Sequence, residues 1–278
     1  MHIPYPFPNP PQNTHPIWQA ALQAALSTND TAEFHLRKRL QTNTPSLAEG
    51  GPLTIAVVGD SVSQGCFYEP VRHDYHAVYH NQLRLMIQAD YPEIPVNVIN
   101  AAVGGVTAPY GLAHFETRVV SHSPDLVILC FGLNDINAPL SDYTNALSGL
   151  FDACKAHRYD AIFLTPNMLN SYRSQQSPKQ YWEYAAKTAA FQQDGTMDRY
   201  MDAARACAKS HNIPVCDAYA VWKEMERQGI DTTSLLVNRI NHPSQEMHFW
   251  FAALLYATLF GKLPLTHEIV VGTDGMYR

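Results

Sequence analysis

The chain has 278 residues, of which 46% are hydrophobic and 16% are charged, and its formal net charge is −6 at pH 7. This composition is typical of a protein with a sizeable buried core and excludes an intrinsically disordered chain. The acidic balance provides no electrostatic footprint for nucleic acid or for an anionic membrane, so we expect neither as a partner.

The cysteines and the apolar runs indicate the compartment. The five cysteines are scattered, with no CxxC pair, which favours reduced thiols over a disulfide framework. The first residues lack the basic and apolar stretches of a secretion signal. The longest apolar run, 249–260, is shorter than the ~20 residues that a membrane span needs. We therefore expect a cytoplasmic protein without a membrane span.

The first 50 residues differ in composition from the rest of the chain. They begin with a segment rich in proline and asparagine, and short helical patterns follow at 17–26 and 31–41. A Gly-Gly-Pro sequence then interrupts any regular element. We predict an N-terminal arm over 1–50 that packs on a single domain over 51–278.

From residue 53 onward, short apolar runs alternate with amphipathic stretches. The apolar runs predict buried strands at 53–58, 96–99, 126–131, 161–164 and 213–216. The amphipathic stretches predict helices at 76–89, 143–156, 198–209 and 244–259. Apolar strands that alternate with helices indicate an α/β fold, a three-layer αβα sandwich with a doubly wound parallel sheet of about five strands.

Ligands of such a sheet bind beyond the carboxyl ends of the strands, and four loops there carry suitable residues. Ser61 follows the first strand in a Gly-Asp-Ser sequence, and Gly105 closes a Gly-Gly pair after the second. Asn134 follows the third strand, and His242 stands just before the last helix. A serine with a histidine suits nucleophilic catalysis, while open N–H groups and an amide suit an oxyanion. The polar and aromatic stretch 166–193 is expected to be irregular and to border the pocket.

These four blocks, in this order, resemble those of the SGNH (GDSL-like) hydrolase family, over about residues 53 to 260. The resemblance implies a flavodoxin-like fold and a serine esterase, with Ser61 as nucleophile and His242 as general base. It also implies an oxyanion hole formed by the N–H groups of Ser61 and Gly105 and the amide of Asn134, with no cofactor and no metal. The expected substrate is a short-chain ester, above all an acetyl ester, with an acetylated sugar among the candidates.

The usual acid of that family is missing from this chain. The family carries an aspartate three residues before the histidine, and Arg239 occupies that position here. Arginine cannot accept a hydrogen bond from the imidazole. Three candidates remain open for this role: a main-chain carbonyl, the carboxamide of Asn238, and a carboxylate from elsewhere, such as Asp231.

Each block also has an ordinary structural explanation as a helix cap or a turn, and the combination of four favours function. Two further acids, Asp60 and Asp135, are expected to hold their turns through hydrogen bonds to the backbone. Three histidines have the spacing of one helix face, but nothing obvious completes a zinc site, so we expect capping or solvated side chains: His73, His76 and His80.

Two alternatives to hydrolysis stay open from the sequence. The same nucleophile would serve acyl transfer to an alcohol, and a carbohydrate- or acyl-binding module would keep the fold without activity. No GxSxG sequence is present, which disfavours an α/β-hydrolase of the nucleophile-elbow type. The phosphate- and dinucleotide-binding sequences GxxxxGK[ST] and GxGxxG are also absent.

Overall fold

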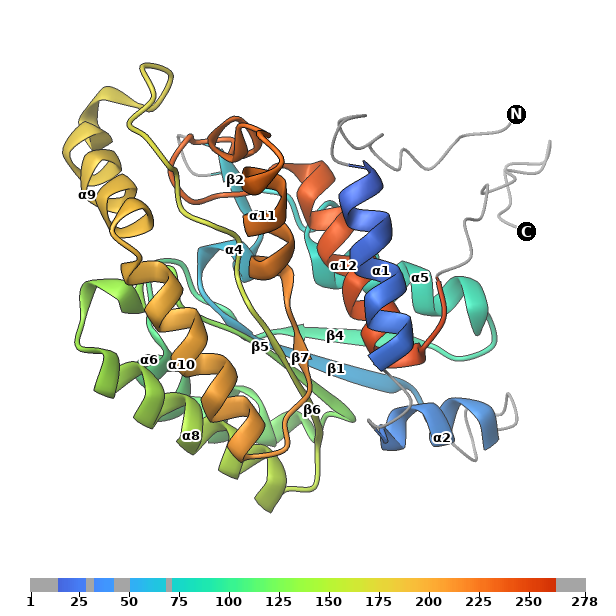
Figure 1. Ribbon diagram of the computed structural model, residues 1–278. Coiled ribbons are helices and arrows are strands. Elements are labelled where there is room, and N and C mark those ends of the chain that lie inside the picture. The colour runs from blue at the N-terminus through green and yellow to red at the C-terminus, as the bar shows by residue number, and fades with distance from the viewer. Residues whose placement is uncertain (1–14, 29–32, 43–50, 69–71, 264–278) are drawn as a thin grey trace.

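The computed structural model describes residues 15–28, 33–42, 51–68 and 72–263 (Figure 1). The strands are β1 (Leu53–Gly59), β2 (Cys66–Tyr68), β3 (Arg72–His73), β4 (Val96–Asn100), β5 (Leu126–Cys130), β6 (Asp160–Leu164) and β7 (Val215–Cys216). The α-helices are α1 (His15–Thr28), α2 (His35–Thr42), α4 (Ser61–Gln64), α5 (Tyr79–Asp90), α6 (Ala108–Ala113), α7 (Phe115–Arg118), α8 (Leu140–Ala156), α9 (Trp182–Gln193), α10 (Thr196–Ser210), α11 (Ala218–Arg227) and α12 (Gln245–Phe260). Short 3-10 helices are η1 (Val120–His122), η2 (Asp135–Asn137), η3 (Lys179–Tyr181) and η4 (Thr232–Leu235).

A sheet of five parallel strands forms the centre of the molecule, in the order β4-β1-β5-β6-β7. All residues of β5 and β6 are buried, which explains their nearly uninterrupted apolar runs. This strand order is that of the flavodoxin-like doubly wound sheet, so the predicted fold is confirmed. The order reverses between β1 and β5, and a ligand is therefore expected beyond the carboxyl ends of these two strands.

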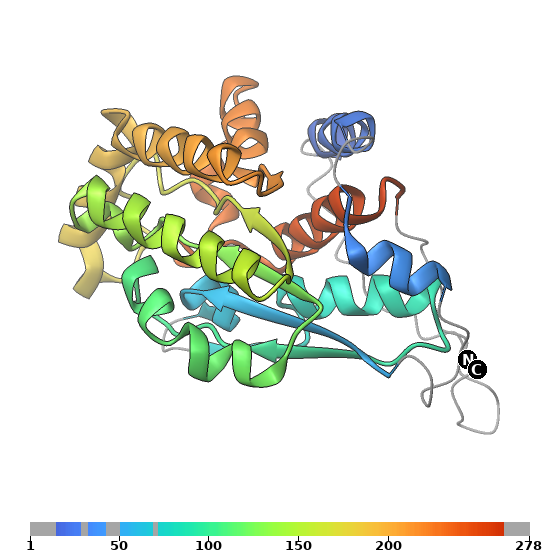
Figure 2. The same cartoon turned by 90° about the horizontal axis from the view of Figure 1, so that it is seen from below.

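Helices cover both faces of the sheet (Figures 1 and 2). Helices α5 and α12 pack together on one face, against the β4 and β7 edges. Helices α6, α8 and α10 form a row on the other face, with α6 near β1 and α8 near β6. A separate two-stranded ribbon, β2 with β3, follows α4. The three layers place every βα loop of the carboxyl edge on one side of the molecule.

The structure contains helices that the sequence did not predict, among them α6, α7, α9 and α11. The stretch 166–193, expected to be irregular, contains α9, whose buried residues are small or polar: Ala185, Thr188, Ala189 and Gln192. Such a face has no strong apolar period to reveal it. The sequence analysis also did not predict α11, although Asp217 caps this helix by accepting a hydrogen bond from the Ala220 N–H.

The N-terminal helix α1 lies against α12 and α11. Trp18 of α1 is fully buried, and its ring stacks on that of Trp250 with 5.7 Å between the ring centroids. Much of the expected arm over 1–50 lies outside the described residues, so its extent stays a prediction. No helix among the residues that the structure describes has the length and apolar character needed to cross a membrane.

Candidate active site

Ser61 is the first residue of α4, directly after the tight turn that follows β1. The strand ends at Gly59, where an added Cβ would stand 2.4 Å from its nearest neighbouring atom, so a side chain has no room there. Asp60 caps the short helix by accepting a hydrogen bond from the Val62 N–H at 2.9 Å. Gly65 ends the helix in the left-handed region, with φ of +94°. These contacts fix the backbone that carries Ser61.

The imidazole of His242 meets the hydroxyl of Ser61. His242 Nε2 lies 2.8 Å from Ser61 Oγ, although the two residues are 181 positions apart in the sequence. Burial lowers the pKa of His242 to about 4, so the ring is neutral at pH 7. A neutral Nε2 at this distance is able to accept the hydroxyl proton, which is the geometry of a nucleophile with its base.

The glycine pair after β4 lies on the wall of the pocket into which Ser61 and His242 open. Gly105 has φ of +77°, a backbone conformation that glycine adopts without strain. The preceding Gly104 donates its N–H to Gln64 Oε1 at 2.8 Å, which ties this loop to α4 and therefore to Ser61. The sequence analysis did not single out Gln64, because a lone amide side chain in a short helix carries no recognisable signal.

Asn134 reaches the pocket from the loop after β5. Its Nδ2 donates to the Val106 carbonyl at 3.0 Å and makes a longer contact of 3.3 Å with the Asp60 carboxylate. The first bond orients the amide, and the second hydrogen lies on the weaker contact. A negative oxygen that develops beside Ser61 is able to compete for that second hydrogen.

The two buried aspartates near the pocket serve the backbone. Asp135 accepts hydrogen bonds from the Ala108 N–H at 2.7 Å and the Gly132 N–H at 2.9 Å. Burial raises the pKa of Asp135 to about 6 and that of Asp60 to about 7. Their contacts agree with the expected turn-holding role. Neither makes a hydrogen bond to His242 among the bonds of the described residues.

The carboxamide of Asn238, one of the candidates to support the imidazole, binds the backbone of its own loop instead. Its Oδ1 accepts three hydrogen bonds, each 3.0 Å long, from consecutive N–H groups: Ile240, Asn241 and His242. Its Nδ2 donates to Asn241 Oδ1 at 2.9 Å. Asn238 thus closes the loop that carries His242, and its oxygen is engaged away from Nδ1 of the ring.

Asp231, the candidate carboxylate, also makes its hydrogen bonds to groups other than the imidazole. Its carboxylate accepts hydrogen bonds from the Tyr172 hydroxyl at 2.7 Å and from the Ser234 N–H at 3.2 Å. Arg239 adopts a left-handed backbone conformation, with φ of +57°, and its guanidinium donates to the Ser234 carbonyl. Within the described part of the chain, no hydrogen bond reaches His242 Nδ1 from either candidate.

The Ser61–His242 pair opens into a pocket of about 460 Å³. Its wall is formed by Ser61, Gln64, Cys66, His73, Gly104, Gly105, Asn134, Tyr181, Tyr184, Asn238, Ile240, Asn241 and His242. None of these described residues is Asp, Glu, Lys or Arg. Two tyrosines come from the stretch 166–193, one of them 38% exposed, so this stretch borders the pocket as expected: Tyr181 and Tyr184. The pocket therefore suits a small, neutral and polar ligand.

The three histidines considered for zinc do not come together. His73 and His76 are exposed and precede α5, while His80 is buried within it, where its Nε2 lies 2.9 Å from the Ser63 carbonyl. Helix α5 starts at Tyr79, later than predicted, so the three histidines do not share one helix face, and the expectation of a capping or solvated side chain is wrong for the buried His80. Among the described residues, no group of three or more His, Cys, Asp or Glu side chains is placed to hold a metal ion.

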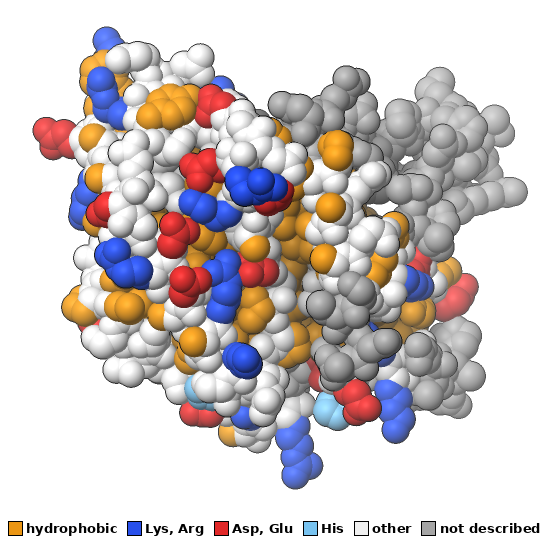
Figure 3. Space-filling view, viewed as in Figure 1, with side chains coloured by type: hydrophobic (Ala, Val, Ile, Leu, Met, Phe, Trp, Pro, Cys, Tyr) orange, Lys and Arg blue, Asp and Glu red, His pale blue; other side chains and the backbone are white. Residues whose placement is uncertain are grey.

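A second hollow, of about 630 Å³, lies between α1, α11 and α12 and is lined mainly by alanine and aliphatic side chains. Figure 3 shows apolar side chains gathered beside these helices, next to the mixed acidic and basic side chains of α10 and α11. This hollow is larger than the Ser61 pocket, but its described wall contains no serine, cysteine or histidine. The chemistry therefore points to the smaller pocket.

Comparison with known proteins gives a family match over most of the chain. The model of the GDSL-like Lipase/Acylhydrolase family matches residues 57–249, a span that includes Ser61, Gly105, Asn134 and His242. An acetylxylan esterase from Geobacillus stearothermophilus is 25% identical over 179 residues, which cover 60% of this chain and 74% of that protein.

Solved structures share the fold. The acetylxylan esterase from Geobacillus stearothermophilus has a TM-score of 0.58 at 22% identity, and the match covers 75% of this chain and 94% of that one. An alpha/beta hydrolase enzyme from the metagenome of Lake Arreo, Spain, has a TM-score of 0.57 at 20% identity, with 74% and 94% covered. Variants of the first enzyme that are described as catalytic mutants replace a serine, a histidine and an aspartate three positions before that histidine.

Proposed function

Because the chain belongs to the GDSL-like lipase and acylhydrolase family and is a carboxylic ester hydrolase, we propose that Ser61 is its nucleophile and His242 its general base. The observation that carries the proposal is the 2.8 Å contact between Ser61 Oγ and His242 Nε2. This contact lies in a pocket whose wall also holds Gly105 and Asn134. These residues line one pocket, which supports the assignment of nucleophile, base and oxyanion donors to a single acyl-transfer site.

In the first half of the reaction, Ser61 Oγ attacks the ester carbonyl carbon while His242 Nε2 takes the hydroxyl proton. The carbonyl oxygen becomes negative, and the N–H groups of Ser61 and Gly105 and the amide of Asn134 stabilise it. The tetrahedral intermediate then collapses. The alcohol leaves with the proton from Nε2, and the acyl group stays on Ser61 as an ester.

In the second half, water takes the place of the alcohol. His242 removes a proton from water, the hydroxide attacks the acyl carbon, and Ser61 leaves as the alcohol with the proton from Nε2. Among the described residues, no carboxylate makes a hydrogen bond to the imidazole that becomes charged in both halves, and Arg239 stands where the family carries the acid. Neutral groups stabilise that charge less than an acid does, so the enzyme is a modest catalyst.

The substrate proposed for this site is an acetyl ester on a neutral sugar. Amide side chains on the wall offer donors and acceptors to hydroxyl groups: Gln64, Asn134 and Asn241. Tyr181 and Tyr184 offer ring faces to a sugar ring. The described wall has little aliphatic surface besides Ile240, which disfavours a long acyl chain. The acetylxylan esterase relative supports the same substrate class.

The test compares Ser61→Ala with a matched control in the same helix. Ser63 is buried and its Oγ lies 2.8 Å from the Tyr79 hydroxyl, so Ser63→Ala removes a hydroxyl that does not face the pocket. We expect Ser61→Ala to lower kcat for p-nitrophenyl acetate by ~10⁴-fold or more, while Ser63→Ala keeps turnover near normal. A folded Ser61→Ala protein with more than a small fraction of wild-type turnover would refute the assignment.

The same assay decides the substrate class. Acetylated xylo-oligosaccharide and p-nitrophenyl acetate are compared with p-nitrophenyl palmitate on the wild-type protein. We expect hydrolysis of both acetyl esters and little hydrolysis of the palmitate, because the pocket has about 460 Å³ and its described wall carries few aliphatic side chains. A preference for palmitate would contradict the proposed substrate while leaving the Ser61 assignment intact.

A further inference from the structure

The loop 236–243 presents His242 without help from an acid. The loop closes on itself through a bridge between Leu236 and Pro243 and through the three N–H groups that Asn238 accepts. These bonds shape the loop internally. They do not fix where the whole loop stands relative to Ser61, because every one of them joins two residues of the loop. Bonds from outside the loop must set that position.

Two asparagines that follow β6 supply bonds from outside. Asn167 Nδ2 donates to the Asn241 carbonyl at 2.9 Å, and the Asn170 N–H donates to the Ile240 carbonyl at 2.8 Å. Both asparagines are fully buried. The two carbonyls belong to the two residues before His242, so these bonds hold the main chain directly before the imidazole-bearing residue.

Further hydrogen bonds fix the side chains of both asparagines. Asn167 Nδ2 also donates to the Met168 carbonyl at 2.8 Å, while its buried Oδ1 has no hydrogen-bond partner among the described residues. An unpaired buried acceptor is costly, so the donor side of this amide determines its position. Asn170 Nδ2 donates to the Ala185 carbonyl at 2.8 Å, and its Oδ1 accepts from the Thr188 hydroxyl at 2.6 Å.

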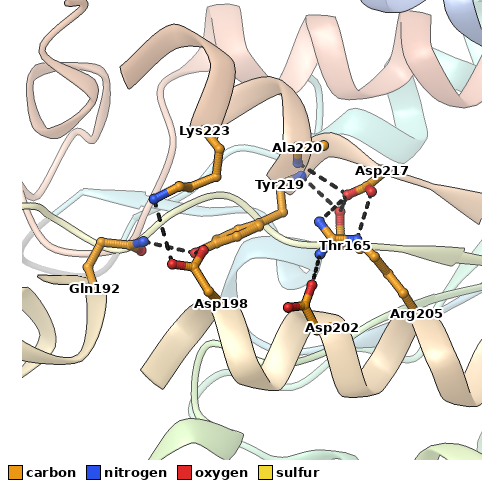
Figure 4. A network of polar contacts seen from close by, with 9 residues as sticks. All are labelled: Thr165, Gln192, Asp198, Asp202, Arg205, Asp217, Tyr219, Ala220 and Lys223. Carbon is orange, nitrogen blue, oxygen red and sulfur yellow. Dashed lines mark hydrogen bonds and ion pairs between the residues drawn. The ribbon is translucent and has the colours of Figure 1, made fainter. Parts of the chain in front are cut away.

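A polar network behind the asparagines keeps their segment in place (Figure 4). The Leu169 N–H, between the two asparagines, donates to Gln192 Oε1 at 3.0 Å. Gln192 Nε2 donates to the Tyr219 hydroxyl at 2.8 Å, and that hydroxyl donates to Asp198 at 2.8 Å. The segment after β6 is thus fastened to α9, α10 and α11 as well as to the sheet.

The network ends in a bidentate ion pair between Arg205 and Asp217. The Tyr219 N–H donates to Thr165 Oγ1 at 2.8 Å, and this hydroxyl donates to Asp217 at 3.0 Å. Arg205 donates to both oxygens of Asp217, at 2.8 and 2.9 Å (Figure 4). Bidentate pairs of this kind have fixed geometry. Hydrogen bonds, joined by the Tyr219 side chain and by the backbone of 165–170, therefore link this ion pair to the carbonyls beside His242.

We propose that Asn167 is a positioning residue for His242, which together with Asn170 holds the imidazole against Ser61 in place of the missing acid. The inference rests on the proposed function, because it assigns the 2.8 Å contact between Ser61 and His242 to these anchors. An acid orients the ring directly through Nδ1, whereas these amides orient the loop through its main chain. A displacement of about 1 Å at a reacting group is enough to cost ~10²-fold in rate.

The experiment uses Asn167→Leu, which keeps the branched shape of the side chain and removes the bond to the Asn241 carbonyl. The matched control is Ser177→Ala, since Ser177 is buried in the same stretch and its Oγ donates to the Ser174 carbonyl, away from the loop. We expect Asn167→Leu to lower kcat by ~10- to 100-fold with KM changed less than ~3-fold. Ser177→Ala should leave both constants within ~2-fold.

A spectroscopic measurement separates this proposal from the proposed function. The pKa of His242 is followed by NMR of histidine carbon-13 labels and assigned by comparison with His242→Ala. Burial holds this pKa at about 4, and its described neighbours include the neutral imidazole of His248. A loosened loop admits water, so the pKa should rise toward the ordinary 6.5 in Asn167→Leu and stay unchanged in Ser177→Ala.

The kcat and the His242 pKa of the Asn167 variants together test the anchoring role. A reduced kcat together with a raised His242 pKa supports the anchoring role. An unchanged His242 pKa in folded Asn167→Leu overturns it, whether or not Ser61 proves to be the nucleophile. Equal losses in Asn167→Leu and Ser177→Ala also overturn it, because the effect would then be general destabilisation. If Asn167→Leu does not fold, Asn167→Ser is measured in the same way, since its shorter side chain gives up the same bond and keeps a polar group.

Discussion

The backbone around Ser61 is fixed within the stretch 59–65, whereas the loop with His242 is held by a segment 74 residues earlier. On the serine side, the backbone conformation is fixed by Gly59 at a crowded position and by the capping Asp60. On the histidine side, amide groups from the end of β6 hold main-chain carbonyls. The nucleophile is thus built by local chemistry and the base by tertiary contacts.

The two sides also differ in charge. Two buried carboxylates with raised pKa values, Asp60 and Asp135, hold the turns of the serine side. The described contacts of the His242 loop are with neutral amides, hydroxyls and carbonyls, apart from the guanidinium of Arg239. The contact between Ser61 and His242 is present although the family's acid is replaced by Arg239. We attribute this to the neutral anchors Asn167 and Asn170. What they provide less of is charge stabilisation in the transition state.

The largest effect expected from a single amide belongs to the serine side. Asn134→Ala should lower kcat by ~10²–10³-fold with little change in KM, because an oxyanion donor acts mainly in the transition state. The control is Asn100→Ala, since the Asn100 side chain holds a neighbouring turn through the Ala102 N–H and the Gln64 carbonyl. Steady-state kinetics beside melting curves check both variants. Equal turnover in the two folded variants would reduce Asn134 to a turn residue.

The pH profile tests the buried base on the other side. Catalysis needs neutral His242, whose pKa burial lowers to about 4, so kcat/KM should stay nearly constant from pH 7 to pH 5 and fall near pH 4. With the ordinary imidazole pKa of 6.5, only about one thirtieth of the base would be neutral at pH 5. A measured acid limb near 6.5 would show that the imidazole is not buried in the working enzyme.

Stability has to be followed at each pH, because other buried groups titrate in the same range. Burial lowers the pKa of His80 to about 4, so its stabilising contribution is present above the unfolded value of 6.5 and is lost as pH falls toward 4. Asp60 has the opposite sign: burial raises its pKa to about 7, so its contribution is present below the unfolded value of 3.8 and is lost as pH rises through 7. Melting curves separate unfolding from protonation of His242.

Much of the fold could be predicted because its signals are local. Strands β5 and β6 are buried along their whole length, and buried parallel strands read as apolar runs. Helix α9 was missed because its buried face is made of small and polar side chains. Helix α11 did carry a signal, the Asp217 cap followed by an apolar spacing that buries Val221, Trp222 and Met225. Its brevity beside a two-residue strand concealed it.

The site divides in the same way. Ser61, Gly105, Asn134 and His242 could be named as candidates because each lies in a short motif at a strand or helix end, and the structure places all four on the wall of one pocket. Asn167 carries no such signal, because its role is a hydrogen bond to a carbonyl 74 residues away. The carboxamide of Asn238 was placed near the imidazole from its position in the sequence. The structure shows it capping the loop backbone, which is the commoner use of an asparagine side chain in a turn.

The smallest effect is expected for Asp231, the nearest carboxylate before His242 in the sequence. Its oxygens accept hydrogen bonds from the Tyr172 hydroxyl at 2.7 Å and from the Ser234 N–H at 3.2 Å, and an asparagine there keeps an acceptor for one of them. Asp231→Asn should therefore change kcat less than ~3-fold, about as much as Tyr172→Phe, which removes the partner hydroxyl. The two variants measured side by side show whether any loss comes from the shared surface bond. A drop of several orders of magnitude in folded Asp231→Asn alone would mean that this carboxylate stabilises the imidazolium, and the His242 side would then contain an acid after all.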